Sequence, residues 1–375
     1  MKPSQNFKYL DELIHGDAEE IILDSDIALS GMEEYEYYEG IDLDVDDLTI
    51  DGNGHSIDAC KKARIFNCTA SGIKIKNITL KNGFNNESGG AILIEDGELT
   101  ISDSTILNSS SGDDGGAIHN DEGELIIEKS TLQDNGAQEH GGAINNWGSL
   151  SVVESSFKSN NANHGGAIFN DDGELDISQT SFLQNTANIG GALFNNDGGE
   201  MAIIQSMFNG NSAEKGGAIL NDNCDLEIRD STFNANMARE DGGAIHTGGE
   251  LTIISSTFKD NSSNRDGGVI FNHRGDVTIK QSSFSANNAN RNGGAIGNDD
   301  SVMVIEKSMF SENTAENGGT ISNDDSVLTI EGSTISQNTA KSHGGAIWIS
   351  RLKDLESDNY TLKDNVPDDV YDASA

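Results

Sequence analysis

Residues 190–215 read GGALFNNDGGEMAIIQSMFNGNSAEK, and this stretch decides the fold because versions of it fill most of the chain. Its Gly-Gly pair occurs eleven times, beginning at residues 89, 115, 141, 165, 190, 216, 242, 267, 293, 318 and 344. The ten intervals cover 344 − 89 = 255 residues, which is a mean period of 25.5. A fixed period of this length is typical of a solenoid that places one structural unit in each repeat.

Each repeat contains three short apolar segments separated by turn residues. The middle one alternates between polar and apolar residues, as in Glu174-Leu175-Asp176-Ile177. Alternation at a period of two predicts strands rather than helices. Three short strands per repeat predict an all-β fold, a parallel β-helix with about 25.5 residues per coil, in which each coil pairs with the next about 4.8 Å further along.

Residues at equivalent positions in successive coils form columns. Three columns are apolar and are predicted to form the core. The middle members of the first are Phe157, Phe182, Phe208, Phe233, Phe258, Phe284 and Phe310. Those of the second are Ile168, Leu193, Ile219, Ile245 and Ile270, and those of the third are Leu175, Met201, Leu226, Leu251 and Val277. A hydroxyl column from Ser104 to Ser333 is predicted to point inward and to bond along the stack. Two asparagine columns, from Asn135 to Asn338 and from Asn120 to Asn323, are predicted to be stacked turn formers.

The two ends depart from the repeat, as the ends of a solenoid must, because an open coil exposes sheet edge and core. Residues 4–16 are predicted to form a short helix that Ser4 caps and Gly16 ends. We therefore divide the chain into an N-terminal cap with a helix and strands (1–45), a parallel β-helix (46–350) and a C-terminal cap or tail (351–375).

The charge of the chain excludes several classes of protein. Acidic residues number 63 and basic residues 23, giving a net charge of −40. A nucleic-acid partner is not expected, because it would need a basic surface. Membrane insertion is not expected either, since no apolar run approaches the roughly 18 residues of a span. Cys60, Cys68 and Cys224 are too few for a disulfide framework.

Acidic residues gather in the turns that follow the first strand of each coil. Carboxylates stacked on successive coils are hard-oxygen ligands that suit Ca²⁺, and the candidate ligands are Asp171, Asp172, Asp197 and Asp222. The alternative is a solvated acidic face whose repulsion ordinary salt relieves. Calcium is the one cofactor that the sequence suggests.

One basic cluster stands out against this acidic background. Arg239, Arg265 and Arg291 occupy the same turn on three successive coils, with Asp241 and Asp266 beside them. Such a cluster could hold the carboxylates of an acidic polysaccharide. It also resembles the polyuronate lyases of the parallel β-helix fold, which need acids for a cation and an arginine or lysine as base, and this resemblance implies a catalytic role for the cluster. The simpler interpretation, which we favour, is a surface network in which the arginines and aspartates neutralise one another.

An apolar strip is the second candidate site. The residue that follows the inward Ile column must point outward by alternation, and on five successive coils it is Phe169, Phe194, Leu220, His246 and Phe271. An exposed strip of this kind marks a binding surface, and aromatic faces suit sugar rings. Coverage by a neighbouring turn or by a second protomer is the alternative.

Two sets of motifs carry a resemblance to known families. The pairing of Gly-Gly-Ala-Ile with Phe-x-x-Asn resembles the repeat of the chlamydial polymorphic outer-membrane proteins. The segment 48–58, with 63–66 and 77–83, is similar to methanogen adhesin-like surface proteins. The likeness covers about residues 5–350, and it implies a right-handed parallel β-helix of the pectate-lyase type and a role at the cell surface.

These observations favour a non-enzymatic, extracellular, adhesin-like rod that binds a surface glycan or protein. The alternative is a polysaccharide lyase or glycoside hydrolase that acts on an acidic polysaccharide. The regular coil length, 24 to 26 residues throughout, favours the rod. Residues 1–6 lack the apolar core of a secretory signal, so a surface location implies that the chain is a fragment of a larger protein.

Overall fold

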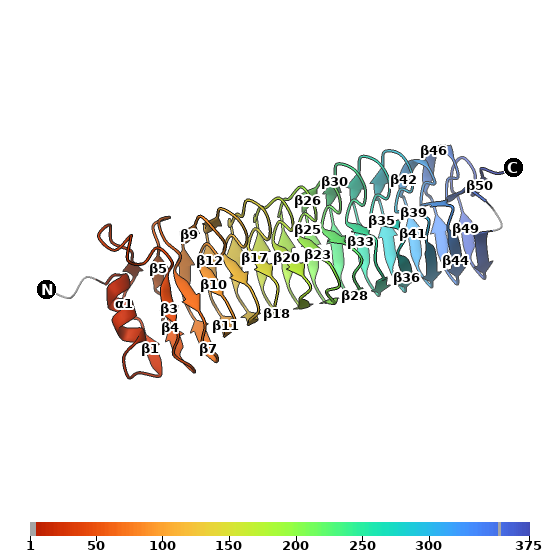
Figure 1. The fold of residues 1–375 in the computed structure, drawn as a ribbon. Helices are drawn as coiled ribbons and strands as arrows, with labels where there is room; N and C mark the ends of the chain where they lie inside the picture. Colours follow the sequence, from red (N-terminus) through yellow and green to blue (C-terminus); the bar gives the residue numbers. More distant parts are fainter. Residues whose placement is uncertain (1–4, 352–353) are drawn as a thin grey trace. The chain divides into compact units, whose positions relative to one another are not determined.

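The computed structural model describes residues 5–351 and 354–375. Residue contacts divide the chain into two compact units, Met1–Thr186 (unit 1) and Ala187–Ala375 (unit 2). In each unit three parallel sheets, named A, B and C, are built by a chain that visits them in turn (Figure 1). The predicted all-β parallel solenoid is therefore confirmed, while its right-handedness stays a prediction from the resemblance.

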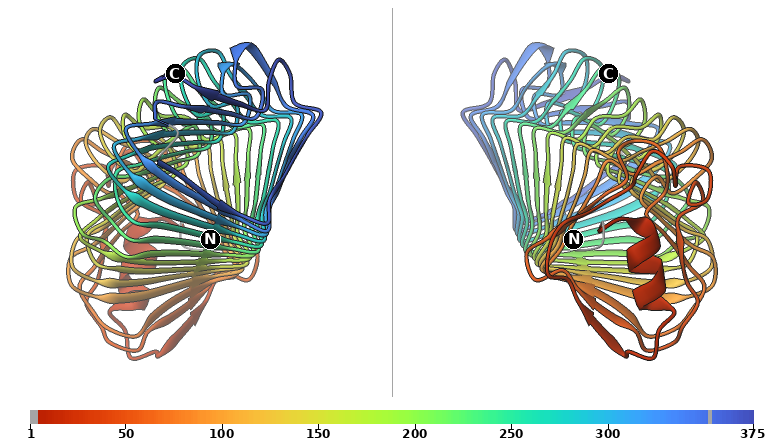
Figure 2. Two further views of the ribbon diagram at one scale, coloured as in Figure 1. Left: turned by 90° about the vertical axis from the view of Figure 1, so that its right-hand side faces the viewer. Right: turned by 90° about the vertical axis from the view of Figure 1, so that its left-hand side faces the viewer.

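Unit 1 begins with helix α1 (Phe7–Ile14), whose buried face is Phe7, Leu10 and Ile14. The helix contacts β2 and β3 and lies across the first coils (Figure 2, right). The predicted cap, Ser4, lies outside the described residues, and Asn6 caps the helix by accepting a hydrogen bond from the Tyr9 amide at 3.1 Å. The helix thus covers the apolar core that the first coil would expose.

The three sheets of unit 1 each take one strand from every coil. In spatial order, sheet A contains β1 (Glu20–Ile22), β4 (Thr49–Asp51), β7 (Ile73–Lys76), β11 (Glu98–Ser102), β15 (Glu124–Glu128), β18 (Ser149–Val153) and β21 (Glu174–Ser178). Sheet B contains β2 (Ile27–Ala28), β5 (Ser56–Asp58), β8 (Thr79–Lys81), β12 (Thr105–Leu107), β16 (Thr131–Gln133), β19 (Ser156–Lys158) and β22 (Ser181–Leu183). Sheet C contains β3 (Ile41–Leu43), β6 (Phe66–Cys68), β10 (Ile92–Ile94), β14 (Ile118–Asn120), β17 (Ile144–Asn146) and β20 (Ile168–Asp171), and β9 (Phe84–Asn85) pairs with β13 (Ser110–Ser111).

Unit 2 repeats this plan. Sheet A contains β24 (Met201–Ile204), β28 (Leu226–Arg229), β32 (Leu251–Ile254), β36 (Asp276–Lys280), β40 (Val302–Glu306), β44 (Val327–Glu331) and β48 (Leu355–Asp358). Sheet B contains β25 (Met207–Asn209), β29 (Thr232–Asn234), β33 (Thr257–Lys259), β37 (Ser283–Ser285), β41 (Met309–Ser311), β45 (Thr334–Ser336) and β49 (Thr361–Lys363). Sheet C contains β23 (Leu193–Asn196), β27 (Ile219–Asn221), β31 (Ile245–Thr247), β35 (Ile270–His273), β39 (Ile296–Asp299), β43 (Ile321–Asp324), β47 (Ile347–Ile349) and β50 (Val370–Asp372). A fourth, narrower sheet holds β26 (Ser212–Ala213), β30 (Met237–Ala238), β34 (Ser262–Ser263), β38 (Asn288–Ala289), β42 (Thr314–Asn317) and β46 (Thr339–His343).

Strands near both ends of the chain pair with the strands of the neighbouring coils. Strand β1 already pairs with β4 in sheet A, so the predicted cap at 1–45 includes the first coil. At the other end, β48 pairs with β44 and β50 pairs with β47. The segment predicted as a cap or tail is therefore a last coil, apart from residues 352–353, which lie outside the described part.

The predicted columns face inward in the predicted register. Phe233, for example, pairs with Phe208 on one side and Phe258 on the other, and all three are fully buried. The hydroxyl column is buried too, but its bonds differ from the expectation. Ser130 Oγ donates to the Glu128 carbonyl at 2.7 Å and accepts the Ser104 amide at 3.1 Å, so the hydroxyls bond to backbone rather than to one another.

The asparagine columns form two hydrogen-bonded ladders. In the first, Asn236 Nδ2 donates to Asn261 Oδ1 at 3.0 Å and to the Phe208 carbonyl of the preceding coil at 3.1 Å. The second ladder is interrupted in unit 2 by Thr247, which accepts from Asn221 but leaves the buried Oδ1 of Asn272 without a partner. The structural role predicted for these asparagines is confirmed.

The interruption gives a first prediction. Thr247→Asn should raise the free energy of unfolding by about 1 kcal/mol, because the new amide can donate to Asn272 and still accept from Asn221. Chemical denaturation measures the change, with Thr257→Asn on the exposed face of sheet B as the matched control. A loss of stability at position 247 alone would show that the coil has no room for the longer side chain.

Candidate functional site

The outer face of sheet C is partly covered by the turn that carries each Gly-Gly pair. Gly242 has a positive φ of 69°, and a Cβ on it would overlap the carbonyl oxygen of Ile245. Only a residue without a side chain lets the turn lie this close to the strand. The repeated Gly-Gly pair therefore folds each turn back over the strand that follows it.

This cover changes the predicted apolar strip. Phe169 is only 5 % exposed, because the ring of His140 lies over it at a centroid distance of 4.4 Å. Leu220 is 7 % exposed, whereas Phe194, His246 and Phe271 remain half-buried. Coverage by a neighbouring turn, which the sequence left open, is what the structure shows at Phe169.

Three of the strip residues line one cavity in unit 2. Phe194, Leu220 and His246 are neighbours on β23, β27 and β31. With Lys215 and the turns at 221–223, 248 and 273–274 they enclose about 450 Å³. This volume lies within the usual range for ligand sites, roughly 300–1,000 Å³. Lys215 was not predicted, since a single lysine in a turn gives no signal by itself.

Phe271 lines a second cavity of about 240 Å³ in the same unit. Trp348 lines it as well, and the small residues Gly297 and Ser322 lie between the two aromatics in the column. The sequence contains this pattern, because two bulky rings separated by two small residues leave a recess. The prediction overlooked it by following only the unbroken run of apolar residues.

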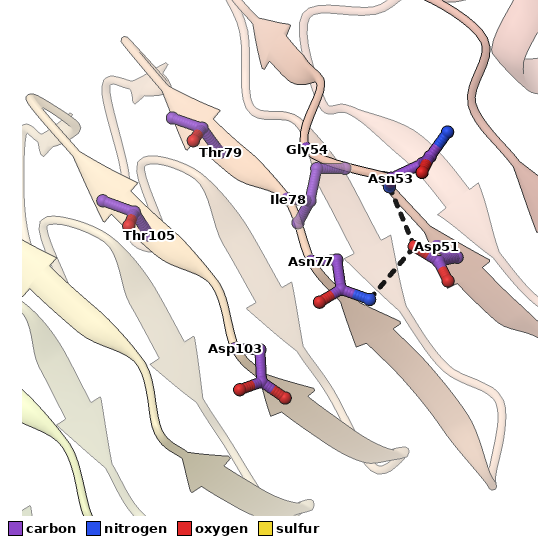
Figure 3. A pocket seen from close by; sticks show the side chains of 8 residues that line it. All are labelled: Asp51, Asn53, Gly54, Asn77, Ile78, Thr79, Asp103 and Thr105. Carbon is purple, nitrogen blue, oxygen red and sulfur yellow. Dashed lines mark hydrogen bonds between the residues drawn. The ribbon is translucent and has the colours of Figure 1, made fainter.

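A polar cavity of about 500 Å³ lies at the corner between sheets A and B of unit 1 (Figure 3). Asp51 accepts hydrogen bonds from the Asn53 amide at 2.8 Å and from Asn77 Nδ2 at 3.3 Å. Thr79 and Thr105, on successive strands, line another side of it. Asp51 is therefore hydrogen-bonded to residues of the same corner. Burial acts to raise its pKa, but these hydrogen bonds act in the opposite direction and the pKa is lowered overall.

His246 is the most perturbed titratable group in the 450 Å³ cavity. Burial lowers its pKa to about 4, with smaller contributions from the nearby charges of Lys215 and His273, against a hydrogen bond to the Asp241 backbone. Its ring lies 5.2 Å from that of Phe271. The imidazole is therefore neutral at pH 7, and it can accept a hydrogen bond there.

This low pKa predicts an acid-dependent loss of stability. Below the ordinary value of 6.5 the unfolded chain takes up a proton that the folded chain refuses until about pH 4. Protonation of His246 therefore leaves the free energy of unfolding unchanged above pH 6.5 and lowers it as the pH falls from 6.5 to about 4, by about 3 kcal/mol at most. In His246→Phe this acid-dependent loss should be absent. Chemical denaturation of both proteins at neutral pH and near pH 4 measures the difference. Parallel pH profiles for the two proteins would contradict it.

Two of the three arginines in the predicted basic cluster are ion-paired. Arg265 lies 3.3 Å from Glu240 and 3.8 Å from Asp241, and Arg291 lies 3.9 Å from Asp266. Arg239 is exposed beside β30. The two aspartates also accept backbone amides of the next coil, Asp241 from Asp266 at 3.1 Å and Asp266 from Asn292 at 3.0 Å. The ion pairs of Arg265 and Arg291 are those that the neutralising interpretation predicts, while the function of the cluster stays a prediction.

The candidate calcium ligands lie at the ends of sheet C strands or in the turns that follow them, in both units. Asp172 in unit 1 and Asp197 in unit 2 have positive φ values of 54° and 45°, so they serve as turn formers. Asp171 is half-buried beside Asp172, and Asp222 is exposed at the rim of the 450 Å³ cavity. Within residues 5–351 and 354–375, no three His, Cys, Asp or Glu side chains are grouped as a metal site requires. The three cysteines are free thiols.

Comparisons with known proteins fit this architecture. Residues 8–111 match the model of a pectate-lyase-like adhesive domain, and residues 205–222, 255–273 and 332–350 match the Chlamydia polymorphic membrane protein repeat. No curated protein matches the chain. No helix in the described residues is long and apolar enough to cross a membrane.

Two solved structures resemble the chain at low similarity. The PL6-family alginate lyase AlyGC shares 8 % identity, with a TM-score of 0.39 over 97 % of this chain and 77 % of that one. A second PL6 alginate lyase, in complex with a trisaccharide, shares 10 % identity, with a TM-score of 0.43 over 96 % and 81 % of the two chains. At these scores the likeness carries no argument about activity.

Proposed function

We propose that the chain is a non-enzymatic, adhesin-like β-helix that binds a cell-surface glycan or protein on the outer face of sheet C. The observation that carries the proposal is the pair of cavities in unit 2, both floored by half-buried aromatic side chains of a single column. The match to the adhesive-domain and polymorphic membrane protein models supports the same role and an extracellular location.

The geometry suits attachment to an extended ligand. Phe194, Phe271 and Trp348 recur along one face of unit 2, so a chain-like ligand can place several groups against aromatic rings at once. Because these side chains are already partly buried, covering the remaining area of each contributes less than the roughly 1.5–3 kcal/mol of full burial. The candidate calcium ligands at 171–172 in unit 1, and at 197 and 222 in unit 2, extend the proposal. Each pair supplies only two carboxylates, so a Ca²⁺ ion there would take its other oxygen ligands from the bound ligand and from water, and would join an anionic ligand to this anionic protein.

A glycan array and a panel of surface proteins, probed with the full chain, test this function. Binding should fall at least tenfold in the double variant Phe194→Ser and Phe271→Ser, and it should persist in Met309→Ser, which removes an exposed side chain from sheet B. Parallel arrays with Ca²⁺ and with NaCl of matched ionic strength test the calcium extension. Equal loss in both variants, or no ligand on either panel, would contradict the proposal.

A further inference from the structure

The 450 Å³ cavity of unit 2 brings an unpartnered ring nitrogen and an unpaired ammonium to one apolar floor. We infer that this cavity binds a sugar residue that carries one negative charge, as a carboxylate or a sulfate. The inference rests on the proposed function and names the ligand class and the place where it binds.

His246 supplies the first element of the site. Its Nδ1 is buried and has no hydrogen-bond partner. A neutral imidazole has one acceptor nitrogen, and with the proton on Nε2 the buried Nδ1 is that acceptor, without a donor in the protein. A buried acceptor of this kind favours a ligand that can donate to it, and a hydroxyl group of a sugar would do so.

Lys215 supplies the second element. It lines the cavity next to His246, and no carboxylate of the described residues lies within ion-pair distance of its ammonium. Lys215 shares this lack of an ion pair with other lysines of the chain, and it differs from them in lining a cavity beside a buried acceptor nitrogen. An anionic substituent on the sugar would provide the missing partner through a charge-assisted hydrogen bond.

The apolar floor of the cavity and its polar rim suit the ring and the hydroxyl groups of a sugar. Phe194 and Leu220 are adjacent in register and present apolar surface, which suits the C–H face of a pyranose ring. Asp222 and Asn223 on the rim offer an exposed carboxylate and an amide to the remaining hydroxyls. Three successive strands span about 10 Å, so the cavity holds a ring and its substituents.

The turn that borders the cavity at this coil differs from those of the two neighbouring coils. The turn from Thr247 to Leu251 is one residue shorter than the turns from Asn221 to Leu226 and from Asn272 to Val277. Gly248, at the rim, bears no side chain, whereas Asp222 and His273 follow the ladder position on the neighbouring coils. Gly248 therefore leaves this side of the cavity without a side chain.

Titration of the full chain with sodium glucuronate and with glucose 6-sulfate, followed by NMR, tests the inference. Both should bind more tightly than glucose or acetate. Lys215→Gln should weaken the two anionic sugars about tenfold and leave glucose unchanged, which corresponds to about 1.4 kcal/mol. His246→Phe, which keeps a ring, should weaken all three sugars. The control Lys259→Gln removes an exposed lysine from sheet B and should change nothing.

Acetate binding as tightly as glucuronate would overturn the inference, because the site would then recognise charge alone. Equal binding by the wild type and Lys215→Gln would overturn it as well. The two proposals fail separately: array ligands that still bind Lys215→Gln leave the adhesive function intact, whereas monosaccharide binding without any array or panel ligand would overturn the adhesive function alone.

Discussion

Phe233→Ala is expected to lower the free energy of unfolding by about 3–5 kcal/mol. The ring is fully buried and lies between two parallel rings, at centroid distances of 4.5 Å to Phe208 and 4.9 Å to Phe258. Because coils lie on both sides, the hole cannot close by local collapse. Chemical denaturation measures the loss.

Met309→Ala is the matched control for this substitution. It removes a side chain of similar size from the outer face of the same sheet, where Met309 is 63 % exposed. We expect a change within about 0.5 kcal/mol for it. A loss below about 1 kcal/mol for Phe233→Ala would contradict the assigned register, since the phenylalanine column would then contribute little to the core.

Gly243→Ala is also expected to lower the free energy of unfolding, by about 3 kcal/mol or more. A Cβ at this position would overlap the carbonyl oxygen of Gly268 on the next coil and would lie 2.7 Å from the carbonyl carbon of Ser262. Both obstacles are backbone atoms, so the two coils would have to separate.

Gly248→Ala is the control that separates the clash between coils from the effect of replacing any glycine by alanine. Its nearest neighbours would lie 3.6 Å from the new Cβ, which is ordinary van der Waals contact. Stability should stay within about 1 kcal/mol and can rise, because alanine restricts the unfolded chain. Melting temperatures of the two variants, recorded side by side, give the comparison. Equal losses would mean that backbone freedom, rather than close approach, explains the need for glycine in each coil.

The core was predictable because its columns follow directly from the period. Once the repeat is aligned, alternation fixes which side of each strand Phe233 occupies. The covering of the outer face was harder to predict, because it depends on how closely a turn approaches a strand. Gly242 signals a tight turn, but the sequence does not say that the turn folds back over the strand that follows it.

The cavity shows the same limit. Phe194, Leu220 and His246 could be grouped from their spacing, whereas Lys215 enters only through the path of a turn. The signal that could have located the site was the departure from the repeat at Thr247 and Gly248. In a regular repeat, an irregular coil is more informative about function than the residues that every coil shares.

Adhesive proteins carry tension, and the ladder break at Thr247 bears on how unit 2 responds to it. Coils of a solenoid contact only their neighbours, so a pulling force would peel them one after another. Each coil of roughly 25 residues would release about 85 Å of extended chain. The step that separates the Asn272 coil from the Thr247 coil lacks the second-ladder bond that joins Asn272 to Asn298 and Asn298 to Asn323. That step should need less force than those two, and unit 2 would lengthen in increments instead of failing at once.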